Sequence, residues 1–358
     1  VLELAPNDPS ALAHVAALKF QSLEFAEGRD HLARARRVDP SNYEALETYL
    51  QHFCGREELT ILVETQLQNY SASTSLALRI RELANQCDGR HVDAMTAQSR
   101  LSRIDTEPKS SVAMLLDLAA LGHEGALRGI DDVHRLIPGL FSDVSMNLAG
   151  YDSSIYYPDI APRRVDTFRW FSEGSANNWF FFIPYAALHI ELGNLDTALA
   201  ILQRSQDMWE RFYDYYEDQH FSTETTRIYA LQAWILGRLG EDAASSELSR
   251  SLLAALEQRN LDKWAEVRNN LADIPLLVLL LNERYDEALE WLRGAEQSGW
   301  TGFQPLVSSP MYAELRAIPE AASILESMES SRSSRLAEIL AAGIPEIDSP
   351  QLLIDRIR

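Results

Sequence analysis

The sequence is poor in the residues that would tie it to particular chemistries. Of its 358 residues only Cys54 and Cys87 are cysteines, so it is not one of the small secreted domains that disulfides hold together. Lysine is limited to Lys19, Lys109 and Lys263, and 53 acidic residues against 32 basic ones give a formal net charge of −21. A surface this negative repels phosphate backbones and anionic lipid head groups, so we expect this region to contact no nucleic acid.

Glycine and proline are also scarce, with 16 and 14 residues, which favours long regular elements with few breaks. Alanine and leucine dominate the apolar residues, and both are strong helix formers, so the composition predicts an all-α fold. The longest apolar stretches, 179–190 and 274–281, are too short to cross a bilayer. The chain begins at Val1 in what reads as the tail of a helix, and we expect an upstream segment.

An internal period organises the first part of the chain. The string LAPNDPSAL at residues 4–12 is echoed by VDPSNYEAL at residues 38–46, which places Pro6 and Pro40 34 positions apart (40 − 6). A period of this length is typical of stacked repeats, in which each unit buries its apolar face against the next one.

Between the two prolines the residues predict a helical hairpin with its turn near residues 23–24. Ala16 on the first helix and Gly28 and Ala35 on the second are small where the helices must approach closely, and larger apolar residues fill the space between them. Pro40 ends the second helix, because proline cannot donate the next backbone hydrogen bond.

This pattern over residues 9–40 resembles the tetratricopeptide repeat (TPR) family, with Ala16 and Leu12 in place of the usual glycine and aromatic residue. Partial copies recur at residues 186–202, 230–244 and 276–295, and weaker ones at 76–108 and 112–138. The resemblance implies a right-handed superhelical solenoid of antiparallel helix pairs. The crossing and turn residues that it assigns are Ala16, Gly28, Ala35, Gly193, Ala198, Gly240, Tyr285 and Ala288.

Four regions follow from this pattern. Residues 1–138 are expected to form N-terminal TPR-like pairs, and residues 139–178 an irregular aromatic loop with a helical insertion. Residues 179–300 are expected to form expanded C-terminal TPR-like repeats. Residues 301–358 are rich in polar side chains and predict a helical cap that closes the solenoid against water.

No catalytic signature is present. The sequence lacks a G-x-S-x-G elbow, a phosphate-binding glycine loop and an H-E-x-x-H zinc motif, and His123–Glu124 has no second histidine one turn on. We therefore expect no catalytic residue, no metal and no cofactor. A lone helical histidine such as His189 is interpreted as a packing residue.

The most unusual composition lies at residues 209–221, WERFYDYYEDQHF. Aromatic rings offer contact area at a low entropy cost, and carboxylates select basic or hydroxylated ligands, so this stretch could form a binding wall. The alternative is a long helix whose rings pack on its neighbours. The candidate partner-binding residues here and in the aromatic loop are Trp209, Phe212, Tyr213, Asp214, Tyr216, Glu217, Tyr156 and Tyr157.

The end of the chain carries a second resemblance. Gly299–Trp300 and the string SPMYAELRAIPEAASILESM at residues 309–328 resemble the closing segment of bacterial signalling proteins in which TPR repeats follow an adenylate cyclase or winged-helix output domain. The resemblance implies the sensory or scaffolding part of a regulator, either cytoplasmic or the periplasmic part of a membrane-anchored protein.

These observations favour a non-catalytic module that binds a protein or peptide. An acidic groove suits a basic or amphipathic segment. Two alternatives stay open: a small-molecule sensor, and an α/α-toroid enzyme acting on carbohydrate.

Overall fold

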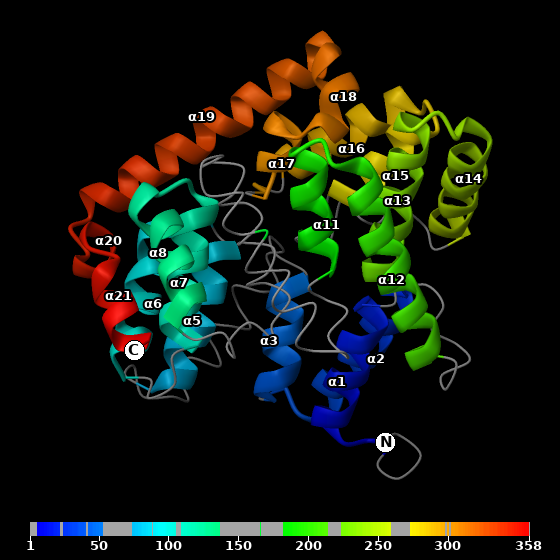
Figure 1. Cartoon of the computed structure of the whole chain (residues 1–358). Helices are drawn as coiled ribbons and strands as arrows, with labels where there is room; N and C mark the ends of the chain where they lie inside the picture. The colour runs from blue at the N-terminus through cyan, green and yellow to red at the C-terminus, as the bar shows by residue number, and fades with distance from the viewer. Residues whose placement is uncertain are drawn as a thin grey trace.

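The computed structural model describes most of the chain, and Figure 1 shows it. The described residues are 6–21, 24–40, 42–52, 74–87, 89–104, 109–136, 165, 182–213, 223–258, 273–297, 299–300 and 302–357. Every regular element within these ranges is a helix, which confirms the all-α prediction.

Most of the described helices form antiparallel hairpins joined by short turns. The hairpins are α1 (Pro9–Gln21) with α2 (Phe25–Val38), α5 (Ser75–Cys87) with α6 (His91–Ile104), α7 (Lys109–Ala120) with α8 (Glu124–Leu136), α11 (Phe182–Glu191) with α12 (Leu195–Tyr213), α13 (Thr223–Arg238) with α14 (Asp242–Gln258), and α15 (Asp273–Leu281) with α16 (Tyr285–Gln297). Helix α3 (Tyr43–His52) packs against α1, α2 and α5.

One hydrogen bond recurs at the turns of these hairpins. The residue just before the second helix donates its backbone N–H to the carbonyl five residues earlier, which satisfies an otherwise orphan acceptor at the end of the first helix. These bonds are Glu24 to Lys19, Arg90 to Asn85, His123 to Leu118, Asn194 to His189, Glu241 to Leu236, and Arg284 to Leu279. Gly193 and Gly240 precede the donors of their turns with φ of 73° and 85°, a left-handed backbone that glycine adopts without strain.

The second helix of most hairpins is small four residues after the donor. Gly28, Ala94, Ala198, Ser245 and Ala288 hold this position, and Leu127 holds it in the α7–α8 hairpin.

The close approach of the two helices explains this preference. A β-carbon on Gly28 would lie 2.4 Å from a ring carbon of Phe20 on the facing helix. Ser245 donates from its hydroxyl to the Ala233 carbonyl of the facing helix at 2.7 Å. A larger side chain would force the pair apart.

The residues assigned to helix crossings lie inside the hairpins, with one exception. Ala16, Ala35, Ala198 and Ala288 are fully buried. Tyr285 is the first residue of α16 and is exposed.

The apolar side chains of the described residues form two large cores that meet at α11. The first core joins α1–α3 to α11–α16 and the start of α19, and the second joins α6–α8 to the end of α19, α20 and α21. On α11, Phe182 and Ile190 belong to the first core, whereas Tyr185 and Leu188 belong to the second. Residues 182–190 are all buried, as expected for a helix that is apolar on every side.

The last segment connects the two cores. It comprises α17 (Gln304–Ser308), the short 3₁₀ helix η4 (Pro310–Tyr312), α18 (Ala313–Ala317), α19 (Pro319–Ala341), α20 (Pro345–Asp348) and α21 (Gln351–Ile357). Helix α19 spans about 35 Å at 1.5 Å per residue and crosses the upper side of the molecule in Figure 1. It packs on α16 and α18 near its start and on α6 farther along, and α21 packs on α7 and α8. Residues 301–358, expected to cap one end, thus return to the N-terminal half.

Two sequence predictions can be compared with the structure only within the described ranges. Of the expected insertion at residues 139–178, only Val165 is described, and it is buried in the second core. No helix among the described residues has both the length and the apolar character that crossing a membrane would require.

Candidate functional site

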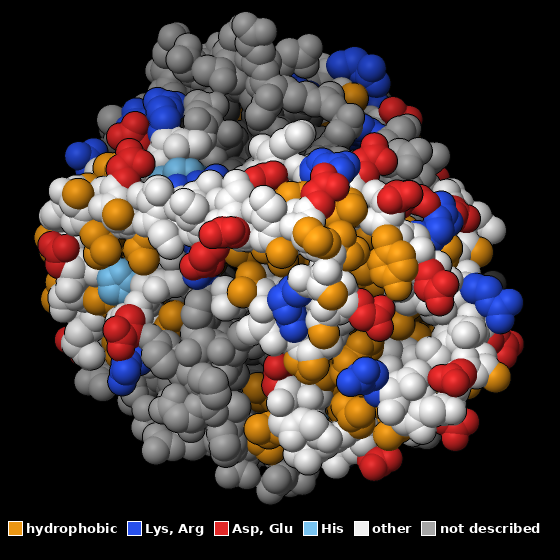
Figure 2. Space-filling view, turned by 90° about the horizontal axis from the view of Figure 1, so that it is seen from above, with side chains coloured by type: hydrophobic (Ala, Val, Ile, Leu, Met, Phe, Trp, Pro, Cys, Tyr) orange, Lys and Arg blue, Asp and Glu red, His pale blue; other side chains and the backbone are white. Residues whose placement is uncertain are grey.

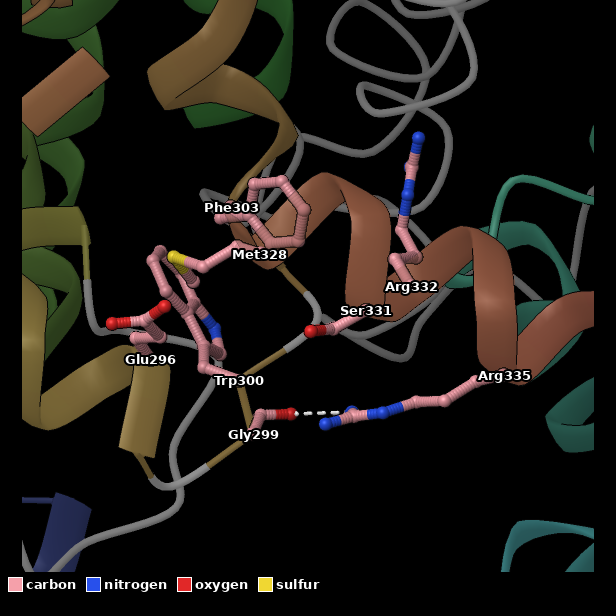
Figure 3. A pocket seen from close by; sticks show the side chains of 8 residues that line it. All are labelled: Glu296, Gly299, Trp300, Phe303, Met328, Ser331, Arg332 and Arg335. Atoms are coloured by element: carbon pink, nitrogen blue, oxygen red, sulfur yellow. Dashed lines mark hydrogen bonds between the residues drawn. The ribbon is translucent and has the colours of Figure 1, made fainter. Parts of the chain in front are cut away.

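A small cavity lies between the end of α16, the segment that leads into α17, and α19 (Figure 3). Its volume is about 30 Å³. The lining residues are Glu296, Gly299, Trp300, Phe303, Met328, Ser331, Arg332 and Arg335. One wall is therefore apolar and aromatic, while α19 supplies hydroxyl and guanidinium groups to the other.

The end of α16 positions the first wall with the same turn that closes the hairpins. Trp300 donates its backbone N–H to the Ala295 carbonyl at 3.1 Å, and Gly299 has a φ of 71°. The Gly299 carbonyl accepts a hydrogen bond from Arg335 Nη1 at 3.0 Å. A β-carbon on Gly299 would lie 3.0 Å from Arg335 Nη2, so glycine serves both the turn and this contact.

The indole of Trp300 forms most of the aromatic wall. Only 8% of Trp300 is exposed, and its ring stands edge-on to Trp291 with centroids 6.3 Å apart. Its Nε1–H finds no acceptor among the described residues. A β-carbon on Gly302 would lie 2.9 Å from Nε1, so glycine at this position avoids a clash with the polar edge of the indole. Buried donors are normally satisfied, and such an N–H favours an incoming acceptor.

The two arginines of the cavity differ in their partners. Arg332 is buried over the Phe303 ring, 5.6 Å from its centroid, and donates to Glu329 at 2.5 Å. Arg335 forms no ion pair within the described ranges, and its partial burial lowers the pKa of its guanidinium. In Figure 3 the Glu296 carboxylate points away from Arg335. Among the described residues, Arg335 is therefore the cation of the cavity that no carboxylate pairs with.

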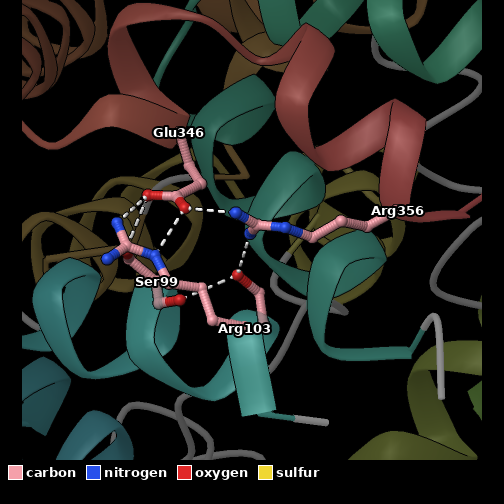
Figure 4. Close-up of polar contacts among 5 residues, drawn as sticks. Ser99, Arg103, Glu346 and Arg356 are labelled. Atoms are coloured by element: carbon pink, nitrogen blue, oxygen red, sulfur yellow. Dashed lines mark hydrogen bonds and ion pairs between the residues drawn. The ribbon is translucent and has the colours of Figure 1, made fainter. Parts of the chain in front are cut away.

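A second polar cluster joins α6 to the C-terminal helices (Figure 4). The side chain of Glu346 on α20 is 1% exposed and accepts from Arg103 Nε and Nη2, from Arg356 Nη2 and from Ser99 Oγ, each at 2.7 Å. Arg356 also donates to Ser102 Oγ at 2.9 Å. Burial alone would raise the pKa of Glu346, but the hydrogen bonds from Arg103, Arg356 and Ser99 outweigh it and hold the pKa far below its usual value. With its oxygens already occupied, this carboxylate has a structural role.

A third cluster lies between α5, α6 and α7. The Gln98 amide donates to Glu82 Oε1 at 3.2 Å and to Asp117 Oδ2 at 2.8 Å, and Arg79 pairs with Glu82 at 2.8 Å. Burial raises the pKa of Asp117, against the hydrogen bonds from Gln98 and Gln86 and the charge of Arg79. Side chains of the protein thus already bind the carboxylates of Glu82 and Asp117.

Most of the predicted partner-binding residues lie outside what the structure describes. Trp209, Phe212 and Tyr213 belong to the last turns of α12, but their side chains are not among the described ones. The other predicted residues, Asp214, Tyr216, Glu217, Tyr156 and Tyr157, fall outside the described ranges. The binding wall therefore stays a prediction.

The histidines singled out in the sequence have local roles. His123 Nδ1 accepts the backbone N–H of Ala126 and so caps the start of α8. His189 stacks edge-on against Tyr185 with ring centroids 4.9 Å apart. Among the described residues, no group of histidine, cysteine and acidic side chains is arranged to hold a metal ion.

Sequence reasoning missed the polar side of the cavity. The sequence singles out Gly299–Trp300 only as part of the resemblance at the end of the chain. Arg335 comes from a helix 36 residues beyond Gly299, and no local pattern connects the two. The local signal available in the sequence is a tryptophan with glycine one position before it and two positions after it.

Comparison with known proteins gives no family for the chain. Neither the protein-family models nor the curated proteins contain a match.

Proposed function

We propose that the protein is a non-catalytic helical-repeat module that binds a protein or peptide partner. The observation that carries this proposal is the recurrence of one hairpin geometry, with the same turn hydrogen bond and a small residue four positions later. When such hairpins stack, equivalent positions fall along one edge and form an extended surface. This regularity supports a TPR-type right-handed solenoid.

The turns of α11–α16 supply such an edge, which we call the turn rim and define as Leu192, Leu239 and Tyr285. Leu192 and Leu239 hold the same position, two residues before the turn donor, and are 40% and 38% exposed. Tyr285 begins α16 and is 38% exposed. The α11–α12 and α13–α14 turns lie on the upper side in Figure 1, and Figure 2, seen from above, shows hydrophobic side chains gathered on the right of this face.

Acidic side chains surround the turn rim. Those exposed at the same turns are Glu241, Asp242, Glu283, Asp286 and Glu287. An apolar row flanked by carboxylates complements a basic amphipathic segment, in which apolar side chains alternate with lysine or arginine.

The wider context is part of the same proposal. The resemblance of residues 298–340 to the closing segment of bacterial signalling proteins supports a role as the sensory or scaffolding part of a larger regulator. Such a part would work in the cytoplasm, or in the periplasm if the regulator is membrane-anchored.

Affinity capture with a matched control tests the proposal. The parent protein, a Leu192→Glu/Leu239→Glu variant and a Val38→Glu control are immobilised, and proteins retained from the native lysate are quantified by mass spectrometry. Val38 is 51% exposed at the end of α2, away from the turn rim. We expect the parent and the control to retain one salt-sensitive protein, and the rim variant to retain about tenfold less of it, equivalent to about 1.4 kcal/mol.

Two results would count against the proposal in different ways. Retention no greater than that of blank resin would contradict an interaction module. Equal retention by parent and rim variant would keep the module but exclude the turn rim as its surface. The predicted aromatic wall then becomes the next surface to test, with Trp209→Ala/Tyr213→Ala.

A further inference from the structure

We propose that the cavity between Trp300 and Arg335 is a binding site for a carboxylate group. The inference is independent of the turn rim, because it depends only on the groups that line the cavity. Two observations support it: an indole N–H without an acceptor and a guanidinium without an ion pair, both within the described residues and both lining one cavity.

The donors face the same space. In Figure 3 the nitrogen edge of the Trp300 indole faces Ser331 and Arg335, which project from successive turns of α19. Arg335 uses Nη1 to bind the Gly299 carbonyl, and a guanidinium has four further N–H donors. An acceptor in the cavity can therefore receive hydrogen bonds from the indole, the hydroxyl and the guanidinium together.

The volume fits a small planar anion. A water-sized group needs about 10–15 Å³, so a cavity of about 30 Å³ accommodates two such groups, as a carboxylate with its two oxygens requires. Hydrogen bonds between a guanidinium and a carboxylate are about twice as strong as those between neutral groups. This adds an electrostatic preference for an anion over a neutral acceptor of the same shape.

The protein's own acids do not fill this role. Among the described residues, Glu296 is the one carboxylate that lines the cavity, and its side chain points to the opposite side of the indole from Arg335 (Figure 3). Glu329, the nearby acid on α19, binds Arg332. In a chain with 53 acidic residues, an arginine left without a carboxylate partner in the described structure favours an external one.

The carboxylate can belong to a small organic acid or to the chain end of a peptide. Both sources offer the same two oxygens to Trp300 and Arg335. They differ in what lies beyond the carboxylate, so their affinities separate them.

Indole N–H resonances provide the test, because the chain contains seven tryptophans and therefore few signals. The full chain, labelled with ¹⁵N-tryptophan, is titrated with acetate and with acetamide as the neutral isostere, at constant ionic strength. A parallel titration with chloride tests a response to any anion. We expect acetate alone to move one resonance downfield, the one that is missing in Trp300→Phe.

Three variants sharpen the assignment. Arg335→Gln keeps an amide donor for the Gly299 carbonyl but removes the charge, and should weaken acetate binding about tenfold or more. Gly302→Ala places a methyl group against the indole N–H and should abolish the response. Arg293→Gln, which alters an exposed pair with Glu320, should bind acetate like the parent. The other six indole resonances, in their parent positions, show that each variant is folded.

A short peptide with a free terminal carboxylate, compared with its amidated form, distinguishes the two sources. If the free-acid peptide binds more tightly than acetate and its amidated form does not bind, the site is assigned to a chain end. If the free-acid peptide binds no more tightly than acetate, the site is assigned to a small acid. The proposal fails if acetate moves no indole resonance, if acetamide or chloride moves it equally, or if Arg335→Gln responds like the parent.

Discussion

Helices α6 and α11 both lie among several neighbours, but they meet them through different chemistry. On α11 the buried residues are apolar apart from His189, and they pack into both cores. On α6 the buried residues include Gln98, Ser99 and Ser102. The adjacent Gln98 and Ser99 bind carboxylates of different clusters, Asp117 and Glu82 through Gln98, and Glu346 through Ser99.

The contrast shows which contacts determine where each helix docks. Apolar packing gives α11 most of its free energy of burial, but such contacts tolerate exchange of similar side chains. Glu346 accepts four hydrogen bonds, from residues on α6 and α21. Because hydrogen bonds are directional, this set fits one arrangement of α6, α20 and α21 only. Polar contacts thus specify where the returning C-terminal helices dock, and apolar contacts supply most of the stability.

The largest loss of stability is expected when both arginine partners of Glu346 are removed. Arg103→Ala with Arg356→Ala leaves a carboxylate that is 1% exposed without an ion-pair partner, which costs about 3–5 kcal/mol of the free energy of unfolding. Chemical denaturation measures the loss. The control, Arg128→Ala, removes an exposed pair with Glu124 and should cost no more than about 1 kcal/mol. A double variant as stable as the parent would show that α20–α21 dock without this cluster.

The charge of Glu346 makes its contribution depend on pH. Glu346→Gln should cost about 1.5–3 kcal/mol at pH 7, since it weakens hydrogen bonds to charged groups. The pKa of Glu346 is lower in the folded chain than its unfolded value of 4.5, so the unfolded chain binds the proton more readily. The stabilisation is therefore complete above pH 4.5 and is lost as the pH falls toward the folded pKa.

The measurement compares denaturation of parent and Glu346→Gln at pH 7, 4 and 3. The difference in the free energy of unfolding between the parent and Glu346→Gln should become smaller as the pH falls. A constant difference would mean that the carboxylate charge contributes nothing.

On the apolar side of the comparison, Ala288→Leu should separate α15 from α16. Ala288 is fully buried at the close approach of the hairpin, and overpacking of such a site costs about 1–3 kcal/mol. Ala322→Leu, on the exposed face of α19, is the control and should change stability by less than about 0.5 kcal/mol. If both variants unfold at the same denaturant concentration as the parent, the hairpin register is wrong.

The smallest effect is expected at Asp117, with the opposite sign to Glu346. Burial raises the pKa of Asp117, so its ionised form opposes folding at neutral pH. Asp117→Asn keeps an oxygen that accepts from Gln98 and Gln86 and removes the charge. The variant should be more stable than the parent at pH 7, and this advantage should disappear well below pH 3.8, where the aspartate is protonated in both states. Lower stability at pH 7 would show that the charge is compensated.

The hairpins were predictable because their signals are local. The first pair was expected to turn near residues 23–24, and α2 begins at Phe25. Gly193 and Gly240 were placed at turns by sequence, and both adopt the left-handed backbone there. Turn chemistry and small crossing residues act within some ten positions of each other, so one sequence is enough to find them.

The long-range features were not predictable for the converse reason. Ser99 and Glu346 are 247 residues apart, and nothing near Glu346 distinguishes it from the other acidic residues of the chain. The segment was expected to close one end of a solenoid, because its polar composition suits a solvent-facing cap. Its docking against α6 depends on the path of α19, which only the assembled structure defines. The same holds for Arg335 in the cavity.

Footprinting of the captured complex tests the central claim, that the turn rim binds the partner, most directly. Hydroxyl-radical labelling of the protein alone and of the complex compares solvent access at Leu192, Leu239 and Tyr285 with that at the exposed Val38 and Leu352. We predict strong protection of the three rim residues and unchanged labelling of the two others. Protection at Val38 or Leu352 with full labelling of the rim would contradict the account.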